Sequence, residues 1–287
     1  MEINQLLTEK YRPQKFDDLI GREQAVETVK NMIANGGINH LLLHGMPGTG
    51  KTTFAKVIAN EIYGEHQTGN FIEFNASSDR GIDNLRNVIL PLAKQSGISK
   101  YPYKIILMDE ADMMTSEAQA SFRRILEQYS ARTRFIFTCN YPYRLIPALV
   151  SRFTAFDFGP IAPKLIAKRL AEINKNENLG KSKEDIINIA KKCGGDLRRA
   201  INYLQSSESI SALEIEKYTI DEIVKLPQDK KIELAFCGDP DRVFDVLWEK
   251  VKSEKRWEYL DKLANCQYKM NNSVHKTLFL SVLLQAM

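Results

Sequence analysis

The stretch Gly45-Met46-Pro47-Gly48-Thr49-Gly50-Lys51-Thr52 decides the fold, because it joins an apolar run to a helical pattern. The apolar run, Leu41-Leu42-Leu43, is typical of a strand that is buried on both faces of a parallel sheet. Glycines let the backbone curl so that its N–H groups point at phosphate oxygens, and the N-terminus of the helix that starts at Lys51 adds a favourable dipole. The pattern therefore predicts a P-loop that holds the phosphates of a nucleotide, and it disfavours a glycine turn without a ligand.

Two side chains of this loop have predicted roles in the chemistry. Lys51 is expected to reach the β- and γ-phosphates of ATP, and the hydroxyl of Thr52 is expected to ligate Mg²⁺. The residues predicted to bind the nucleotide here are Gly45, Met46, Pro47, Gly48, Thr49, Gly50, Lys51, Thr52 and Thr53.

A second apolar run, Ile105-Ile106-Leu107-Met108, ends on the two carboxylates Asp109 and Glu110. Because the C-terminal ends of parallel strands meet at one edge of a sheet, these acids can lie beside the P-loop despite their distance in sequence. We expect Asp109 to hold Mg²⁺, and we expect Glu110 to orient or deprotonate the attacking water. Asn140 follows a third apolar run and is expected to contact the γ-phosphate or to position the water. A solvated turn is the weaker interpretation of the two acids.

The first 160 residues alternate short apolar runs with helical patterns, which is typical of βα units that build a parallel sheet. The stretch 159–163 contains Gly and Pro and ends this pattern, so we expect a domain boundary there, followed by helices alone. The predicted strands are His40–His44, Phe71–Asn75, Lys104–Asp109, Arg134–Cys139 and Ala155–Phe158. The predicted helices are Lys51–Ile62, Ile82–Gln95, Ser116–Tyr129, Pro163–Asn174, Lys183–Lys192 and Asp196–Gln205, and a further helical face carries Val243, Phe244, Leu247, Trp248 and Val251.

Composition excludes several classes of protein. In 287 residues, no apolar run approaches the roughly 20 residues that span a bilayer, and the N-terminus lacks the features of a secretory signal. We therefore expect a protein of the cytoplasm and nucleoid, or of the nucleus, that is not secreted and has no membrane partner. The net charge of +4 permits a polyanionic partner without requiring one. The four cysteines, Cys139, Cys193, Cys237 and Cys266, form no CxxC pair and are expected to be buried, reduced thiols.

Six motifs together resemble one family of ATPases. Asp109-Glu110-Ala111-Asp112 resembles the Walker B motif of AAA+ ATPases, and the other motifs resemble the clamp-loader branch, in particular the small subunits of replication factor C. They occur in the order of the family, from residue 8 to about residue 207. These other motifs are Glu9-Lys10-Tyr11-Arg12-Pro13, Asp18-Leu19-Ile20-Gly21, Asn75-Ala76-Ser77-Ser78-Asp79-Arg80-Gly81-Ile82-Asp83, Ser151-Arg152-Phe153 and Gly195-Asp196-Leu197-Arg198-Arg199-Ala200-Ile201-Asn202.

The resemblance implies an α/β fold in which a P-loop AAA+ parallel sheet is flanked by helices and is followed by a small helical lid and a short helical collar. The implied domains are a nucleotide-binding domain over residues 1–160, a lid over 161–222 and an oligomerisation collar over 223–287. Members of the family carry a longer collar, so we expect the collar of this chain to be shortened.

The resemblance also implies roles that spacing alone does not assign. Asn140 would be sensor 1, and Arg198 would be sensor 2, which reaches the γ-phosphate from the lid. Arg152 would act in trans, as an arginine finger in the nucleotide site of the next subunit, rather than as a simple helix cap. The residues implied for the adenine pocket are Thr8, Tyr11, Arg12, Pro13, Ile20 and Gly21.

By the same resemblance, the chain is expected to be an ATPase subunit of a sliding-clamp loader. Such a subunit uses ATP and Mg²⁺ to load a DNA polymerase clamp onto primer–template DNA. Its expected partners are the clamp, the backbone of primer–template DNA, copies of itself and a large loader subunit. Arg80 and Arg86 would contact the DNA backbone, although a solvated face explains these arginines equally well.

Two alternatives remain open from the sequence. A related AAA+ motor for branch migration or fork remodelling would share the P-loop and the acids, but the motifs at 10–13 and 151–153 disfavour it. A scaffold subunit that binds ATP without hydrolysing it is disfavoured by the presence of Glu110.

Overall fold

The computed structural model describes residues 6–77, 85–95, 103–205, 215, 218–236, 240–271, 273 and 275–287. The chain forms two compact units, residues 1–207 and residues 208–287.

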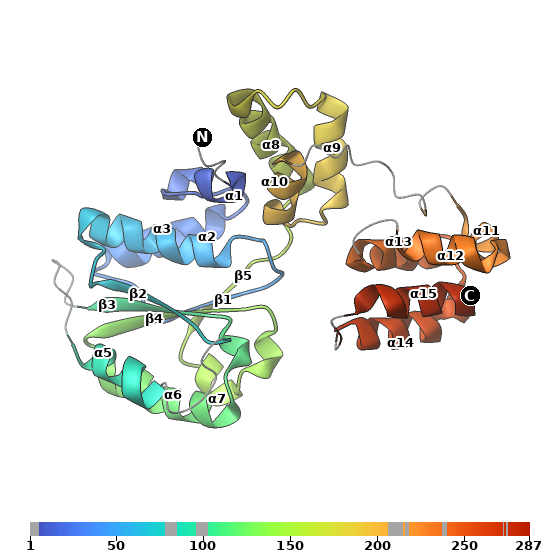
Figure 1. Ribbon diagram of the computed structural model, residues 1–287. Coiled ribbons are helices and arrows are strands. Elements are labelled where there is room, and N and C mark those ends of the chain that lie inside the picture. The colour runs from blue at the N-terminus through green and yellow to red at the C-terminus, as the bar shows by residue number, and fades with distance from the viewer. Residues whose placement is uncertain are drawn as a thin grey trace, which may run out of the picture. The chain divides into compact units, whose positions relative to one another are not determined.

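A parallel sheet lies at the centre of the first unit (Figure 1). In the described part of the chain this sheet has five strands, in the order β2-β3-β4-β1-β5. The predicted α/β sheet is therefore confirmed, and no strand end differs from the prediction by more than one residue. The strands are β1 (Leu41–His44), β2 (Phe71–Asn75), β3 (Lys104–Asp109), β4 (Thr133–Cys139) and β5 (Thr154–Asp157).

The strands bury both of their faces, as their apolar runs predict. Alternate residues enter two separate cores, because successive side chains of a strand point to opposite faces. Ile105, Leu107 and Ile136 pack in the core beneath α2 (Glu23–Ala34) and α3 (Lys51–Tyr63). Ile106, Phe135 and Phe137 pack on the opposite face, which α5 (Leu90–Lys94), α6 (Ser116–Tyr129) and α7 (Pro147–Val150) cover (Figure 1).

A side-chain cap explains where α6, one of the helices on this second face, begins. The hydroxyl of Thr115 accepts the backbone N–H of Ala118, so Thr115 is the N-cap of α6. The predicted helix over Ile82–Gln95 can be compared from residue 85 on, since 82–84 lie outside the described residues, and there the structure has a π-helical turn at Leu85–Ile89 before α5. Pro91 is a physical reason for this difference, since proline has no N–H to continue an α-helical ladder.

The helices that follow β5 in the first unit pack against one another (Figure 1). They are α8 (Pro163–Glu177), α9 (Lys183–Lys192) and α10 (Leu197–Gln205), which match the predicted helices except at two ends. Asn178, in the left-handed conformation, ends α8 three residues later than predicted. The short N-terminal helix α1 (Leu7–Lys10) docks here, because the N–H of Leu7 donates to the side chain of Gln205 at 3.1 Å.

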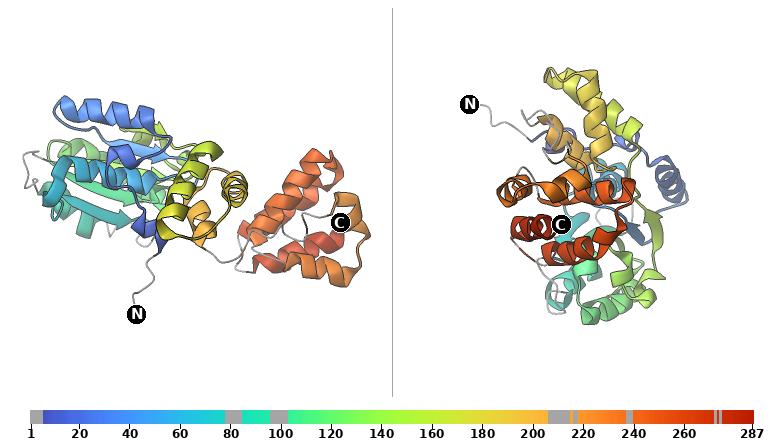
Figure 2. Two further views of the ribbon diagram at one scale, coloured as in Figure 1. Left: turned by 90° about the horizontal axis from the view of Figure 1, so that it is seen from above. Right: turned by 90° about the vertical axis from the view of Figure 1, so that its right-hand side faces the viewer.

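The second unit is built of helices in its described part (Figures 1 and 2), and it has an apolar core of its own. The predicted face of α13 supplies much of it: Val243, Phe244, Leu247 and Val251 are buried, and Trp248 packs against them. The helices described in this unit are α11 (Ile220–Lys225), α12 (Gln228–Ala235), α13 (Pro240–Ser253), α14 (Leu260–Asn271) and α15 (Lys276–Ala286). Short 3₁₀ turns lie at Phe16–Asp18, Gly64–His66, Ala111–Met113, Pro142–Arg144 and, in this unit, Trp257–Tyr259.

Two expectations from composition can be compared with the described residues. Cys139, Cys193 and Cys266 are buried, as predicted, whereas Cys237 lies outside the described residues. Within the ranges that the structure describes, no helix has the length and apolar character needed to cross a membrane.

Phe122 of α6 is the residue whose loss we expect to weaken the first unit most clearly. Its ring is fully buried and meets the rings of Phe135 and Phe137 edge-on, with centroids 5.1 and 5.0 Å away. Phe122→Ala should lower the free energy of unfolding by about 3–5 kcal/mol, because it removes burial and leaves a cavity. Chemical denaturation measures this change. Tyr143→Ala is the control, since Tyr143 is 77% exposed and its loss should change stability by less than about 0.5 kcal/mol.

Candidate active site

The P-loop follows β1 in a conformation that glycine adopts without strain. Gly48 and Gly50 have φ angles of 71° and 95°. A Cβ atom on Gly45 would lie 2.4 Å from the carbonyl oxygen of Phe158, so only glycine fits between the loop and the end of β5. The loop is thus fixed against the sheet on one side and opens toward a cavity on the other.

Lys51 and Asn140, which the sequence places 89 residues apart, meet in this loop. The ammonium group of Lys51 donates to Asn140 Oδ1 at 2.9 Å and to the carbonyl oxygens of Gly45 and Met46, both at 2.8 Å. Burial lowers the pKa of Lys51 from its usual value, while Asp109 acts in the opposite direction. A phosphate group would offer this ammonium an anionic acceptor in place of neutral carbonyls.

The two residues predicted to hold a metal ion are in direct contact. The hydroxyl of Thr52, in the first turn of α3, donates to Asp109 at the tip of β3, with distances of 2.9 Å to Oδ1 and 3.2 Å to Oδ2. A carboxylate and a hydroxyl are the oxygen ligands that Mg²⁺ prefers, and phosphate oxygens and water commonly complete its octahedral shell. The residues present therefore fit a magnesium ion that is bound together with a nucleotide.

Glu110 occupies a strained position at the end of β3. Its φ angle is +55°, a left-handed conformation that glutamate rarely adopts. Its backbone N–H donates to Thr138 Oγ1 at 3.2 Å, and the same hydroxyl donates to Asp109 Oδ1. One hydroxyl group on β4 therefore fixes both acids, and such local strain is typical of residues that function in catalysis.

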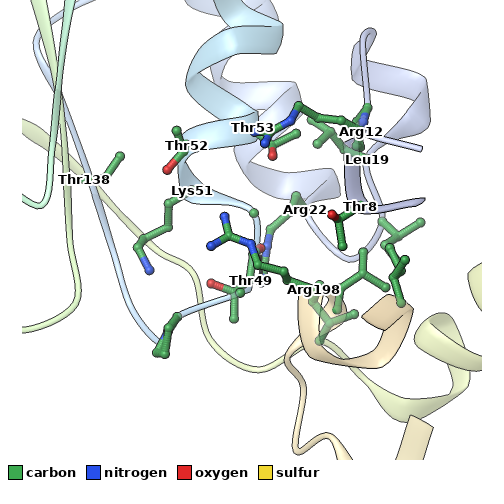
Figure 3. A pocket seen from close by; sticks show the side chains of 18 of the residues that line it. Thr8, Arg12, Leu19, Arg22, Thr49, Lys51, Thr52, Thr53, Thr138 and Arg198 are labelled. Carbon is green, nitrogen blue, oxygen red and sulfur yellow. Dashed lines mark hydrogen bonds between the residues drawn. The ribbon is translucent and has the colours of Figure 1, made fainter. Parts of the chain in front are cut away.

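The helical lid closes the other side of the site. Arg198 lines the cavity from α10, and Figure 3 shows its side chain extending toward the P-loop. The N–H of Leu197 donates to the carbonyl of Gly48 at 3.2 Å, which joins the start of α10 directly to the loop. The carboxylate of Asp196 lies against Gly48 and accepts the N–H of Arg199 at 2.8 Å, as an N-cap does.

The cavity between the P-loop and the lid has a volume of about 190 Å³. The N-terminal segment forms its far wall, where the hydroxyl of Tyr11 donates to Glu177 and Arg12 Nε donates to Glu9 at 3.0 Å. The side-chain hydrogen bond from Arg12 lowers the pKa of Glu9. Of the predicted residues, those that line the cavity are Thr8, Tyr11, Arg12, Pro13, Ile20, Pro47, Gly48, Thr49, Gly50, Lys51, Thr52, Thr53, Asp109, Glu110, Asn140 and Arg198.

Known proteins resemble this chain in sequence and in fold. Residues 41–159 match the model of the ATPase family associated with various cellular activities (AAA), and residues 168–208 match the RCF1/5-like AAA+ ATPase lid domain. A replication factor C small subunit of Picrophilus torridus is 40% identical over 80% of this chain and 73% of its own length. The chain belongs to the replication factor C small-subunit family.

Two further proteins show the range of the similarity. Replication factor C subunit 5 of Mus musculus is 42% identical to this chain. The match covers 69% of this chain and 59% of the mouse protein. In fold, the chain is similar to the RuvB Holliday junction branch migration motor of Thermotoga maritima, with a TM-score of 0.57, 16% identity and coverage of 83% of this chain and 72% of that one. At that identity, the likeness to RuvB shows a shared AAA+ fold.

Arg152 does not line the cavity of the chain described here. It follows the short helix α7, where its Nε donates to Glu127 of α6 at 2.9 Å and its Nη1 donates to the carbonyl of Ala148. The hydrogen bond from Arg152 lowers the pKa of Glu127. Arg152 is thus held on the surface of the sheet's second helical layer, as part of an exposed ion pair.

The remaining predicted residues do not line the cavity or cannot be placed. Gly21, Gly45 and Met46 are not among the residues that line it, although Gly21 and Met46 adjoin lining residues in the chain and the carbonyl of Gly45 accepts from Lys51 at 2.8 Å. Arg80 and the side chain of Arg86 lie outside the described part of the chain.

Outside the quoted motifs, the sequence reasoning missed three polar side chains that line the cavity: Arg22, Thr138 and Arg169. Thr138 carried a usable signal, because it is a polar residue directly after the apolar run Phe135-Ile136-Phe137, one position before the end of the strand. Arg169 stacks over the ring of Tyr11, 5.8 Å from the ring centroid, and no motif indicated this contact.

Thr138→Val tests whether the hydroxyl group positions the two acids. Valine keeps the shape of the side chain, but it leaves Asp109 and the N–H of Glu110 without this partner. We expect ATP turnover to fall about tenfold or more, while the Kd for ATP changes less than about threefold, because hydrogen bonds to charged groups contribute about 1.5–3 kcal/mol. Steady-state kinetics and nucleotide titration measure the two quantities.

Thr133→Val is the matched control for this substitution. Thr133 is buried at the opposite end of β4, and its hydroxyl donates to the carbonyl of Ala93 at 3.1 Å. A fall in turnover that is equal in the two variants would show that Thr138 only stabilises the strand.

Proposed function

We propose that this chain is an ATPase subunit of a sliding-clamp loader, which loads a DNA polymerase clamp onto primer–template DNA. Membership of the replication factor C small-subunit family carries this proposal. The P-loop and the two acids lie at one edge of the sheet, where they would supply the chemistry of ATP hydrolysis. Under this proposal the partners are the clamp, the DNA backbone, other copies of this chain and a large loader subunit.

The chain's own groups support a mechanism by in-line attack of water on the γ-phosphate. The backbone N–H groups of the P-loop and the ammonium of Lys51 would hold the phosphates. Mg²⁺, held by Thr52 and Asp109, would neutralise charge on the β- and γ-phosphates. Glu110 would accept a proton from the attacking water, and Asn140 would orient that water or the γ-phosphate.

Arg198 would sense the γ-phosphate from the lid. Arg198 lies on α10, whose first N–H, that of Leu197, donates to the P-loop carbonyl of Gly48. A movement of the guanidinium toward the γ-phosphate would therefore move the lid relative to the loop. We propose that adenine binds beside Thr8, Tyr11 and Arg12, at the wall that the N-terminal segment forms. The proposed nucleotide-binding domain, lid and collar cover residues 1–160, 161–222 and 223–287, and the lid-model match at 168–208 supports the second of these.

Arg152 would complete the site of a neighbouring subunit. Its position outside the cavity of its own chain supports this role, since it cannot neutralise charge on the nucleotide there. A guanidinium supplied in trans typically accelerates phosphoryl transfer by about 10³–10⁵. Assembly would therefore control hydrolysis, because no subunit would have a full set of charges alone.

The response of ATP turnover to the clamp tests the proposed function. In a complex assembled with a large subunit, the clamp and primer–template DNA together should raise turnover at least about tenfold. A complex that responds to branched DNA but not to the clamp would instead be a branch-migration or fork-remodelling motor. In the same assay Glu110→Gln should abolish turnover, and unchanged turnover would indicate an ATP-binding scaffold.

Arg152→Ala tests the role in trans. We expect turnover by the assembled complex to fall by about 10³ or more, while the mutated subunit binds ATP at its own site within about twofold of the unmodified chain. Turnover by the complex and nucleotide titration of the isolated subunit measure the two effects. Arg132→Ala is the control, because Arg132 is exposed and its side chain donates to the carbonyl of Lys94 at 3.1 Å without lining the cavity. Loss of ATP binding by the Arg152 variant itself would contradict the assignment.

A further inference from the structure

Arg22 is a half-buried arginine that binds backbone carbonyl groups instead of an acid. A single nitrogen, Nη2, donates to the carbonyl of Gly159 at 2.7 Å and to that of Thr49 at 3.2 Å, while Nη1 donates to the carbonyl of Gly21 at 3.1 Å. The guanidinium also lies over the ring of Phe158, 4.8 Å from its centroid. Among the residues that the structure describes, no carboxylate forms an ion pair with it.

The two carbonyls that share Nη2 belong to parts of the chain with different tasks. The carbonyl of Thr49 is in the same peptide group as the N–H of Gly50, a donor of the P-loop. A hydrogen bond from a cation to that carbonyl polarises the peptide group and fixes its plane, so the N–H becomes a stronger and better-oriented donor to phosphate. Figure 3 shows Arg22 and Thr49 close together at the wall of the cavity.

Gly159 lies on the other side of this bridge, in the connection from the sheet to the lid. It comes after the end of β5 at Asp157 and before the start of α8 at Pro163. This connection is tightly packed: a Cβ atom on Gly195 would lie 2.3 Å from the side chain of Pro160, and the N–H of Ile161 donates to the carbonyl of Gly195 at 3.2 Å. A displacement at Gly159 must therefore move the start of α8 and the turn before α10 together.

We propose that Arg22 is a positioning residue that couples phosphate binding at the P-loop to the position of the helical lid. Its Nη2 fixes the separation of the loop and the lid connection, because both carbonyls must stay within hydrogen-bond distance of one atom. When phosphate draws the Thr49–Gly50 peptide group toward itself, the guanidinium transmits that shift to Gly159. The guanidinium also places a positive charge behind a P-loop donor, which favours phosphate.

This inference rests on the proposed function, namely that ATP binds at this P-loop, and the experiment separates the two. The variant Arg22→Gln keeps a hydrogen-bond donor but removes the charge and the planar fork. We expect its Kd for ATP and for ADP to rise by the same factor, about tenfold, because the Gly50 donor serves a phosphate that both nucleotides contain. A loss confined to ATP would point to the γ-phosphate and would overturn the proposal.

Hydrogen–deuterium exchange measures the coupling to the lid. In the unmodified chain, ATP should slow exchange both in the P-loop and in the segment 159–166. In Arg22→Gln at saturating ATP, protection should persist in the P-loop and disappear from 159–166. Protection that persists in both segments would overturn the proposal, whereas an unmodified chain that binds no ATP would overturn the proposed function instead.

Arg134→Gln is the matched control. Arg134 is also half-buried, donates to a backbone carbonyl (Ile38, 2.6 Å) and lies over an aromatic ring (Tyr103, 4.7 Å), but it does not line the cavity. It should lose similar stability and keep both ATP affinity and the protection of 159–166. If Arg22→Gln does not fold, Arg22→Lys decides the question. Lysine keeps the charge without the fork, so a rise in Kd of at least about threefold for both nucleotides is expected, and an unchanged Kd would overturn the proposal.

Discussion

The parallel pairing of β1, β3 and β4 is the constraint on which the rest of this site depends. The pairing places Leu43 beside Thr138 and Met108 beside Phe137, so the ends of the three strands reach the same edge of the sheet. The P-loop, the acids and Asn140 are attached to those ends, which is why groups far apart in sequence meet within hydrogen-bond distance. The apolar strands fix the edge, and the polar residues that follow them supply the chemistry.

The elements with the strongest periodicity could be predicted from the sequence. A strand that is buried on both faces gives an uninterrupted apolar run, and such runs identified β1, β3 and β4 to within a residue. The P-loop lysine and the aspartate at the tip of β3 could also be predicted, because the phosphates and the metal ion demand particular residue types at fixed distances from the strand ends. Their contacts with Asn140 and Thr52 agree with that reasoning.

Other parts of the site could not be predicted, because they depend on contacts between segments that have no pattern in common. Arg22 binds the carbonyls of two distant backbone segments, and carbonyls are present at every residue, so the sequence gives no sign of which ones an arginine will reach. The π-helical turn before α5 could not be predicted for a different, local reason. The apolar spacing there is helical, but a proline changes the backbone without changing that spacing.

The left-handed backbone of Glu110 has a consequence for the history of this fold. Glycine and asparagine are comfortable at a φ angle near +55°, and glutamate is not, so local backbone energetics favour replacement of Glu110. Under the proposed function, the role of its carboxylate as a base opposes that replacement. Among duplicated genes of this fold, a glycine or asparagine at this position would mark copies that have lost ATP hydrolysis but keep an intact P-loop. Under the proposed function, the residue at position 110 would therefore distinguish copies that hydrolyse their nucleotide from copies that only bind it.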